Sequence, residues 1–206
     1  MVITVSFIDN TRNPTGSGGK IMVAAMNIGH RFLAGWGLGF LDINDGASIL
    51  DCGCGGGANI KKLLGMNKSG RVNGVDYSEV SVAKARAVNR AEIAGGRCEI
   101  VRASVIELPF TDAAYDIVTA FETVYFWPDL WKSFGEIRRV LRNGGTFLIC
   151  NECGGDNEKD EKWTEKIDGM TIYKDVQLKN ILEQAGFRNI QIHKREKGWL
   201  CITAQK

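Results

Sequence analysis

The glycine-rich segment at residues 49–57 constrains the fold of this chain more than any other part of the sequence. A short apolar run ends in Asp51, and four of the five residues at 53–57 are glycine. Glycine is needed where the backbone adopts a positive φ or lies against a bound molecule with no room for a Cβ atom. The segment therefore predicts a strand that leads into a ligand-binding loop, with the Asp51 carboxylate as a hydrogen-bond acceptor at the end of the strand.

Length and composition predict one domain with an appendage. The chain has 206 residues, of which 44% are hydrophobic, and this is enough for one sizeable core. Its 26 basic and 24 acidic residues give a formal net charge of +2 without a basic run, so we expect no nucleic-acid partner. The sequence shows neither a signal-peptide pattern nor an apolar stretch of membrane-spanning length, so we expect a cytoplasmic protein with no membrane span.

The six cysteines are expected to be reduced and structural. Most of them lie within apparent strands, where cysteine packs as a small hydrophobic side chain. Two pairs are closely spaced, Cys52 with Cys54 and Cys150 with Cys153, but no nearby histidine or second CxxC motif completes a familiar zinc pattern. We therefore expect no metal site.

Strands and helices are predicted to alternate after the glycine loop. Helices are expected at 58–64, 78–94, 129–141 and 176–185, and strands at 49–51, 71–76, 98–102, 115–121, 146–151, 188–193 and 198–203. The connection at 194–197 is too short for a parallel crossover and predicts an antiparallel hairpin. The fold class is thus α/β: a Rossmann-like, doubly wound, seven-stranded sheet that is mostly parallel, with an antiparallel C-terminal hairpin and helices on both faces.

Residues 1–46 are predicted to form an N-terminal arm that precedes a domain at 47–206. A flexible glycine-rich stretch at 16–19 is followed by a predicted helix at 20–33. One apolar face of this helix is expected to carry Ile21, Ala24, Ala25, Ile28 and Phe32. We hypothesise that residues 10–40 form a lid over the acceptor; an extra helix that only covers the sheet is the alternative.

The spacing between the glycine loop and the next acid indicates a ribose-containing cofactor. Asp76 ends the second predicted strand nineteen residues after Gly57, which is the separation at which an acid reaches ribose hydroxyls. The segment from Gly53 to Ala58 also fits the permissive dinucleotide fingerprint. A pyrophosphate would be repelled by Asp51, whereas the ammonium of an amino-acid moiety could use this carboxylate as an acceptor.

Several ordered motifs resemble those of the class I S-adenosylmethionine-dependent methyltransferases, within the branch called methyltransferase type 11, which includes ubiquinone and menaquinone biosynthesis enzymes. The resemblance runs from about Ala47 through most of the chain. The matching segments are 49–57, 74–78, 101–110, 115–118 and 138–145.

The resemblance implies S-adenosyl-L-methionine as the cofactor, with S-adenosyl-L-homocysteine as the product, and assigns cofactor contacts by position. The residues are Asp51, Cys52, Gly53, Gly55, Asp76, Tyr77, Ser104, Val105 and Phe121. The family usually has an aspartate that bonds the adenine amino group where this chain has Ser104. A hydroxyl can accept the same bond without charge assistance, so we predict weaker or less base-selective cofactor binding.

The chemistry that the family implies is in-line displacement on an electrophilic methyl group, which depends mainly on proximity and orientation. A general base is needed only for an acceptor that arrives protonated. The candidate catalytic residues are Glu122 and Tyr125 after the fourth strand and His30 in the N-terminal arm, whereas His193 on the closing hairpin is a remote candidate. Each of them could instead have a structural role.

The sequence favours methyl transfer to a small-molecule acceptor. Phe121, Tyr125, Phe126 and Trp127 cluster just after the fourth strand and indicate an apolar or aromatic acceptor. Two alternatives stay open: a nicotinamide-dependent oxidoreductase, and a non-catalytic protein that binds S-adenosylmethionine. The acceptor, the methylated atom and the oligomeric state cannot be read from the sequence.

Overall fold

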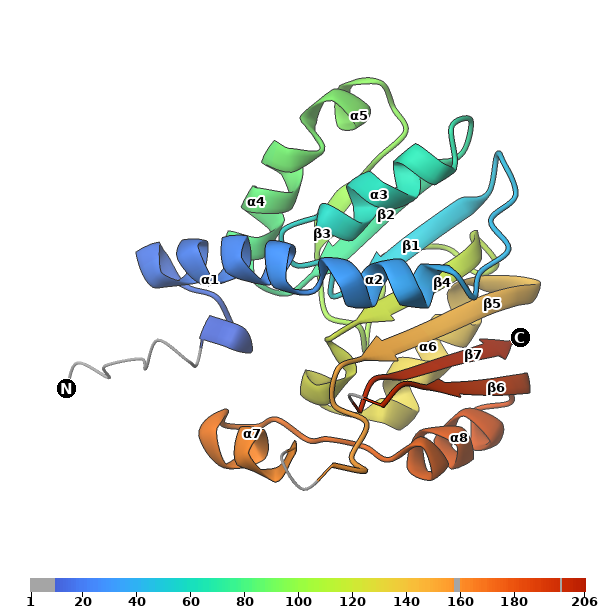
Figure 1. Ribbon diagram of the computed structural model, residues 1–206. Helices are drawn as coiled ribbons and strands as arrows, with labels where there is room; N and C mark the ends of the chain where they lie inside the picture. Colours follow the sequence, from blue (N-terminus) through green and yellow to red (C-terminus); the bar gives the residue numbers. More distant parts are fainter. Residues whose placement is uncertain (1–9, 158–159, 197) are drawn as a thin grey trace.

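The protein folds around one seven-stranded sheet with the strand order β3-β2-β1-β4-β5-β7-β6 (Figure 1). The computed structural model describes residues 10–157, 160–196 and 198–206. The first nine residues of the predicted arm and Lys197 in the predicted hairpin turn lie outside these residues. The first five strands in the sheet order pair in parallel, and β7 pairs antiparallel with both β5 and β6, so the predicted fold class is confirmed.

The chain order places the strand switch point between β1 and β4, where the sheet grows in opposite directions. Ligands of open α/β sheets bind beyond the carboxyl ends of the strands at this point. The strands are β1 (Ser48–Cys52), β2 (Arg71–Asp76), β3 (Ile100–Arg102), β4 (Tyr115–Phe121), β5 (Leu141–Asn151), β6 (Arg188–Lys194) and β7 (Leu200–Gln205).

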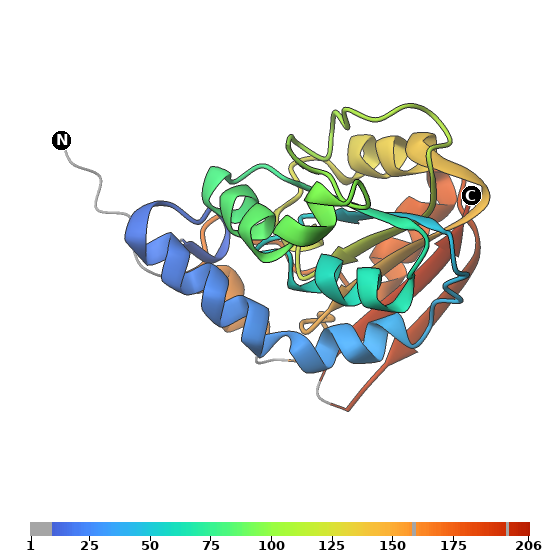
Figure 2. The same cartoon turned by 90° about the horizontal axis from the view of Figure 1, so that it is seen from above.

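Helices cover both faces of the sheet (Figures 1 and 2). They are α1 (Gly16–Gly29), α2 (Arg31–Leu38), α3 (Ala58–Met66), α4 (Glu79–Val88), α5 (Arg90–Ala94), α6 (Leu130–Val140), α7 (Glu161–Lys166) and α8 (Asp175–Gln184). Helices α2, α3 and α4 share one apolar core with the sheet, and α6 and α8 share the core of the opposite face. None of the helices within the described residues is long and apolar enough to cross a bilayer.

Local capping explains where two of the helices begin. The Ser78 hydroxyl accepts a hydrogen bond from the amide of Ser81 at 3.3 Å, and the Asp129 carboxylate accepts one from the amide of Lys132 at 3.0 Å. Such side chains satisfy amides that have no partner within the helix. Because both caps directly follow a strand or its loop, they turn the chain back over the sheet and leave the strand ends open.

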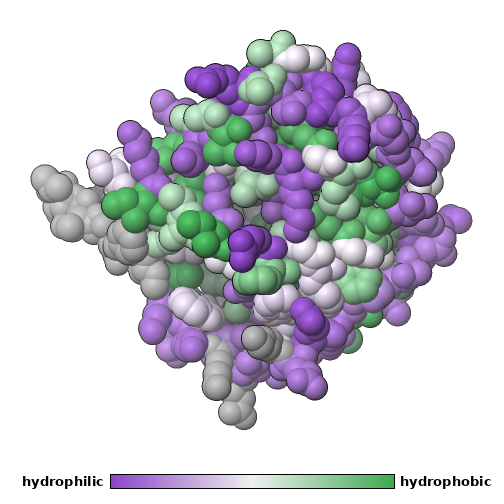
Figure 3. Space-filling model, turned by 45° about the horizontal axis from the view of Figure 1, so that its top comes forward, coloured by the Kyte–Doolittle hydropathy of each residue, from purple (hydrophilic) through white to green (hydrophobic). Residues whose placement is uncertain are grey.

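The predicted N-terminal helix is wrong in its extent, and most of the residues expected on its apolar face are exposed. The stretch at 16–19, expected to be flexible, forms the first turn of α1, and the chain continues through His30 into α2. Val23 and Leu33 are buried, whereas Ile21, Ile28 and Phe32 are 63%, 73% and 68% exposed. Figure 3 shows hydrophobic side chains at the surface over these helices. The apolar stripe therefore faces away from the fold, whereas Val23 packs against the glycine loop at Gly56 and Leu33 joins the core beneath α2.

Two other boundaries differ from the sequence prediction. The helix expected at 78–94 is interrupted at Asn89, whose side-chain amide donates to the carbonyls of Gly57 and Ala85, both at 3.0 Å. The fifth strand begins at Leu141 rather than at residue 146, since residues expected to end the preceding helix pair with the sheet instead. Asn89 thereby ties α4 to the glycine loop, a link that local sequence does not reveal.

Candidate active site

The glycine loop is held in a shape that side chains would not allow. Gly53 has a φ of +73°, and a Cβ atom at this position would overlap the Thr123 side chain. A Cβ atom at Gly56 would overlap the side chains of Asn27 and Val23 on α1. The loop is therefore packed between the chain that follows β4 and the N-terminal helix, and it needs glycine for both contacts.

Asp76, at the end of β2, organises this loop from the neighbouring strand. Its Oδ2 atom accepts a hydrogen bond from the amide of Gly55 at 2.9 Å, and its Oδ1 atom accepts one from the amide of Ser78 at 2.8 Å. Burial raises the pKa of Asp76, and the two amide bonds oppose that shift. The carboxylate is thus anchored by backbone donors and lies in the wall of a cavity.

Asp51 and Cys52 lie behind the loop and outside the lining of the cavity, contrary to the position expected for cofactor contacts. Both are buried, and the Thr119 hydroxyl donates a hydrogen bond to Asp51 Oδ1 at 2.7 Å. Burial raises the pKa of Asp51 to about 7, which the bond from Thr119 opposes. Both residues belong to β1, where successive side chains alternate between the faces of the sheet. Cys52 joins the apolar core of one face, and Asp51 is buried beside Thr119 of β4.

One cavity of about 590 Å³ opens at the carboxyl ends of the strands. It brings together most of the cofactor-binding residues predicted from the sequence. Those in its lining are Gly53, Gly55, Asp76, Tyr77, Ser104, Val105 and Phe121. A site of this size and position, with polar groups from several strand ends, is where an α/β fold binds a small ligand.

The segment before α1 crosses the cavity near Tyr77. The Tyr77 hydroxyl donates a hydrogen bond to the Arg12 carbonyl, and the Ser78 hydroxyl donates one to the Pro14 carbonyl at 2.9 Å. The Arg12 guanidinium reaches the far side, where it donates to the carbonyl of Asp168 at 3.3 Å. The N-terminal segment and the chain after α7 therefore meet over the cavity.

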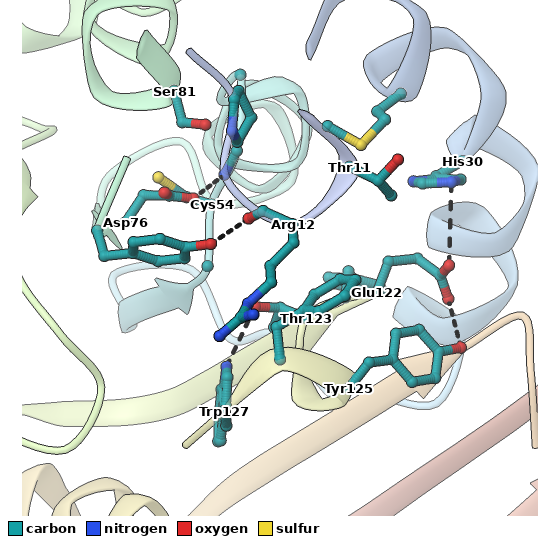
Figure 4. A pocket seen from close by; sticks show the side chains of 18 of the residues that line it. Thr11, Arg12, His30, Cys54, Asp76, Ser81, Glu122, Thr123, Tyr125 and Trp127 are labelled. Carbon is teal, nitrogen blue, oxygen red and sulfur yellow. Dashed lines mark hydrogen bonds and ion pairs between the residues drawn. The ribbon is translucent and has the colours of Figure 1, made fainter. Parts of the chain in front are cut away.

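The opposite end of the cavity contains all three predicted catalytic residues. The Tyr125 hydroxyl donates to Glu122 Oε1 at 3.2 Å, and His30 Nε2 lies 3.9 Å from Glu122 Oε2 (Figure 4). His30 comes from the end of α1, and the other two follow β4. Glu122 has a φ of +57°, in the left-handed region that costs a non-glycine residue about 1 kcal/mol or more. The fold thus holds Glu122 in an unfavourable backbone conformation, and its carboxylate faces His30 and Tyr125.

Burial controls the protonation of this end of the cavity. It raises the pKa of Glu122 to about 8, and the nearby Glu152 charge adds to the shift, whereas hydrogen bonds from the Glu152 amide and from Tyr125 oppose it. The pKa of His30 is lowered by burial, against the opposing charge of Glu152. Burial also raises the pKa of Tyr125, and the Glu122 charge adds to that shift. Near neutral pH the site therefore holds a neutral imidazole beside a carboxyl group that titrates close to the working range.

Glu152 and Cys153 are site residues that the sequence interpretation missed. Glu152 follows β5 as Glu122 follows β4, and its amide donates a hydrogen bond to Glu122 Oε1. The amide of Cys153 donates to the Tyr125 hydroxyl at 2.8 Å. The sequence could have indicated Glu152, because it directly follows a predicted strand and the carboxyl ends of adjacent parallel strands meet at one edge of the sheet. One nitrogen or carboxylate oxygen from each of His30, Glu122 and Glu152 lies within 4.8 Å of the other two. This end of the cavity could therefore bind a cationic group.

The remaining walls at this end are apolar. The Trp127 indole donates a hydrogen bond to the Thr123 hydroxyl at 3.1 Å, which fixes its ring at the cavity edge. Besides Tyr77 at the other end, the aromatic, methionine and isoleucine residues in the lining are Met22, Met26, Phe121, Tyr125, Phe126, Trp127, Trp163, Ile167 and Met170. His193 lies elsewhere, stacked on Phe40 with ring centroids 3.8 Å apart. The cavity therefore has a polar, glycine-walled end and an aromatic end with one acidic cluster.

Comparisons with known proteins agree with this architecture. Residues 50–149 match the family described as a methyltransferase domain. The chain is 29% identical over 159 residues to cycloartenol-C-24-methyltransferase of Arabidopsis thaliana, covering 73% of this chain and 47% of that protein. It is 34% identical over 111 residues to 27-O-demethylrifamycin SV methyltransferase of Amycolatopsis mediterranei, covering 54% and 40%.

The fold also resembles that of a solved S-adenosylmethionine-dependent methyltransferase from Aquifex aeolicus. The TM-score is 0.75 at 19% identity, over 90% of this chain and 97% of that one. Against the curated relatives the coverage is smaller, because the chain spans about a third to a half of the length of the first relatives it matches.

Proposed function

Since the chain belongs to the class I S-adenosylmethionine-dependent methyltransferases, we propose that it transfers the methyl group of S-adenosylmethionine to a small-molecule acceptor in the cavity at the strand ends. The observation that carries this proposal is the single cavity that joins the Gly53–Asp76 end to the Glu122–His30 end. One end suits the cofactor and the other suits an acceptor. Both reactants can therefore occupy a common space.

The residues present fit the cofactor. Asp76 is an anchored acid beside the glycine loop, at the position where a carboxylate accepts hydrogen bonds from ribose hydroxyls. Tyr77 and Val105 provide surfaces for the adenine, and the Ser104 hydroxyl is available to its amino group. When bound, S-adenosylmethionine supplies an electrophilic methyl group. Asp51 is assigned an indirect role, because it supports the loop from beneath.

At the acceptor end, the protein would orient the nucleophile and take up its proton. Glu122 is the proposed proton acceptor, since its carboxylate lies in the cavity and its pKa of about 8 matches a base that works near neutral pH. The Tyr125 hydroxyl donates a hydrogen bond to it, and the His30 imidazole lies 3.9 Å from it. The apolar walls support an acceptor with an apolar or aromatic body, in line with relatives named for cycloartenol and for a rifamycin.

The N-terminal arm at 1–46 is proposed as a lid on the domain at 47–206. Support comes from Arg12, which reaches across the cavity to Asp168, and from the backbone carbonyls that hold Tyr77 and Ser78. Closure of such segments excludes water from a reaction. The six free cysteines, five of them buried, support a reducing cytoplasmic compartment as the location.

A methyl-transfer assay tests the proposed function. Purified protein is incubated with methyl-labelled S-adenosylmethionine and a panel of phenols, polyketides, isoprenoids and sterols, and labelled product is measured. We expect transfer to at least one apolar hydroxyl-bearing acceptor, together with release of S-adenosylhomocysteine. Tight cofactor binding without transfer to any acceptor would instead favour a non-catalytic binding protein.

A further inference from the structure

A continuous apolar stripe faces solvent along the N-terminal helices. It consists of Ile21, Ala25, Ile28 and Phe32, spaced by four, three and four residues, and all four side chains are exposed. This spacing places them on one side of α1 and the start of α2. No element within the described residues covers the stripe. Exposed apolar patches of this kind commonly mark interaction sites.

The charged side chains on α1, α2 and α3 are all basic. Helices α1, α2 and α3 contain no aspartate or glutamate. Lys20 and Arg31 flank the stripe on α1 and α2, and the Arg31 guanidinium lies 4.8 Å from the centre of the Phe32 ring. Lys61 and Lys62 are exposed on α3, and the Lys62 ammonium lies beside α2 at Gly35. The chain as a whole is nearly balanced, so this is a local concentration of positive charge.

We propose that the stripe formed by Ile21, Ala25, Ile28 and Phe32 docks on the surface of an anionic lipid membrane. Apolar side chains on one side of a helix enter the boundary between headgroups and acyl chains, and flanking lysine and arginine pair with anionic headgroups. The long basic side chains can keep their charges at the headgroups while their stems lie along the apolar surface. A protein partner would need an apolar surface bordered by acidic side chains. An anionic membrane offers both an apolar layer and negative charge, so we favour it as the partner of the stripe.

The same helix connects this surface to the active site. The inner side of α1 contributes Met22, Met26, Asn27 and His30 to the cavity, while its outer side carries the stripe. Docking would hold the cavity mouth close to the bilayer. If the proposed methyl transfer is correct, the acceptors are then membrane-partitioned molecules that pass along α1. The docking itself does not depend on catalysis and can be tested without it.

Vesicle flotation tests the docking directly. The full chain is mixed with vesicles of phosphatidylcholine alone, or of phosphatidylcholine with 30% phosphatidylglycerol, at low and high salt. We expect binding to the anionic vesicles, weakened by salt. Ile28→Ser and Phe32→Ser should each weaken it about tenfold, because each removes a large apolar side chain from the lipid. The double variant Lys61→Glu, Lys62→Glu should weaken binding to the anionic vesicles more than either single substitution.

Trp131→Ser is the matched control. Trp131 is a large exposed aromatic residue on α6, on the opposite face of the sheet, so its loss should leave binding unchanged. Circular dichroism and calorimetry with S-adenosylmethionine show whether each variant is folded and retains its cofactor site. Absence of binding to anionic vesicles, or equal binding by wild type and the stripe variants, would overturn the proposal. Dimerisation in solution that is lost in Ile28→Ser would do the same, because a second copy would then cover the stripe.

Discussion

The two ends of the cavity are built in different ways. The end near Asp76 is made from two adjacent strands and one loop, and its carboxylate is anchored by two backbone amides. The end near Glu122 combines three segments from distant parts of the sequence: the end of α1, the chain after β4 and the chain after β5. Its acid is held by one backbone amide, that of Glu152, together with the Tyr125 hydroxyl, and it faces the His30 side chain.

This difference separates binding from chemistry. A carboxylate fixed by the backbone can accept hydrogen bonds from a ligand without changing its own position, which suits recognition of an invariant cofactor. A buried carboxyl group beside another acid titrates near neutral pH, which suits proton transfer. Substitutions at the Glu122 end should therefore change turnover, and substitutions at the Asp76 end should change cofactor affinity.

The largest expected effect concerns Glu122. Glu122→Gln keeps the shape of the side chain but removes the proton acceptor, so kcat with a hydroxyl-bearing acceptor should fall about 100-fold or more. The dissociation constant for S-adenosylmethionine should change little. Steady-state kinetics and calorimetry measure the two quantities. Glu107→Gln, at an exposed carboxylate outside the cavity, is the control, and an equal loss of kcat there would remove the assignment.

The converse experiment uses Asp76. Asp76→Asn removes the charge from hydrogen bonds to the ribose, which are worth about 1.5–3 kcal/mol, so the dissociation constant should rise about 10- to 100-fold. At saturating cofactor, kcat should remain close to that of the wild type. Asp42→Asn, at an exposed acid distant from the cavity, serves as the control. A large loss of kcat with unchanged cofactor affinity would contradict the claim that the Asp76 end serves cofactor binding and the Glu122 end serves turnover.

The pH dependence of kcat/KM tests the role assigned to the Glu122 end of the cavity. Since burial raises the pKa of Glu122 to about 8, the carboxylate form should become populated as the pH rises. The groups that face it are His30, Tyr125 and Glu152. We expect kcat/KM to rise about tenfold per pH unit below pH 8 and to level off above it. The same inflection in Glu122→Gln would show that another group controls the profile.

Protein stability should reveal the same buried acids. The folded-state pKa of Glu122 lies above its ordinary value, so the neutral side chain favours the folded state below pH 4.5, and this contribution is lost as the pH rises to about 8. Asp51 acts in the same direction up to about pH 7. The unfolding free energy should therefore decline over this range by a few kcal/mol, and less steeply in Glu122→Gln. Chemical denaturation at several pH values measures it, and identical slopes would contradict the burial of this group.

The smallest effect is expected at Ser104, which lies in the cavity lining beyond β3. Ser104→Asp supplies a charged acceptor for an amino group, and S-adenosylmethionine should bind a few times more tightly. Calorimetry with the adenosyl cofactor and with its inosine analogue measures both affinity and base selectivity. An unchanged dissociation constant would count against a contact between Ser104 and the adenine edge.

The sequence signals for the two ends of the cavity differ in kind, for a physical reason. Glycine loops and strand-end acids act through local backbone geometry, so Gly53 and Asp76 could be placed from spacing alone. The acceptor end depends on tertiary contacts. Glu152 was missed although it follows a predicted strand, and the sequence did not indicate that Val23, rather than Ile21, packs against the glycine loop.

Other errors follow from the same cause. Asn89 interrupts a predicted helix because its side chain serves the glycine loop, and residue spacing carries no trace of that bond. The contact between Asp51 and the cofactor stays a prediction: in the structure Asp51 lies outside the cavity lining and accepts a hydrogen bond from Thr119, a tertiary contact that the motif does not reveal. Strand order and fold class were predictable because the alternation of elements and the short final connection allow few arrangements.

Calorimetric titration with S-adenosylmethionine, S-adenosylhomocysteine and NADH tests the central claim most directly, with Asp76→Asn titrated in parallel. We expect one adenosyl ligand per chain with a dissociation constant in the micromolar range, or about −8 kcal/mol. We also expect weaker binding to Asp76→Asn and no binding of NADH. Binding of NADH in place of the adenosyl pair, or affinity for S-adenosylmethionine that is unchanged in Asp76→Asn, would contradict the proposed cofactor site.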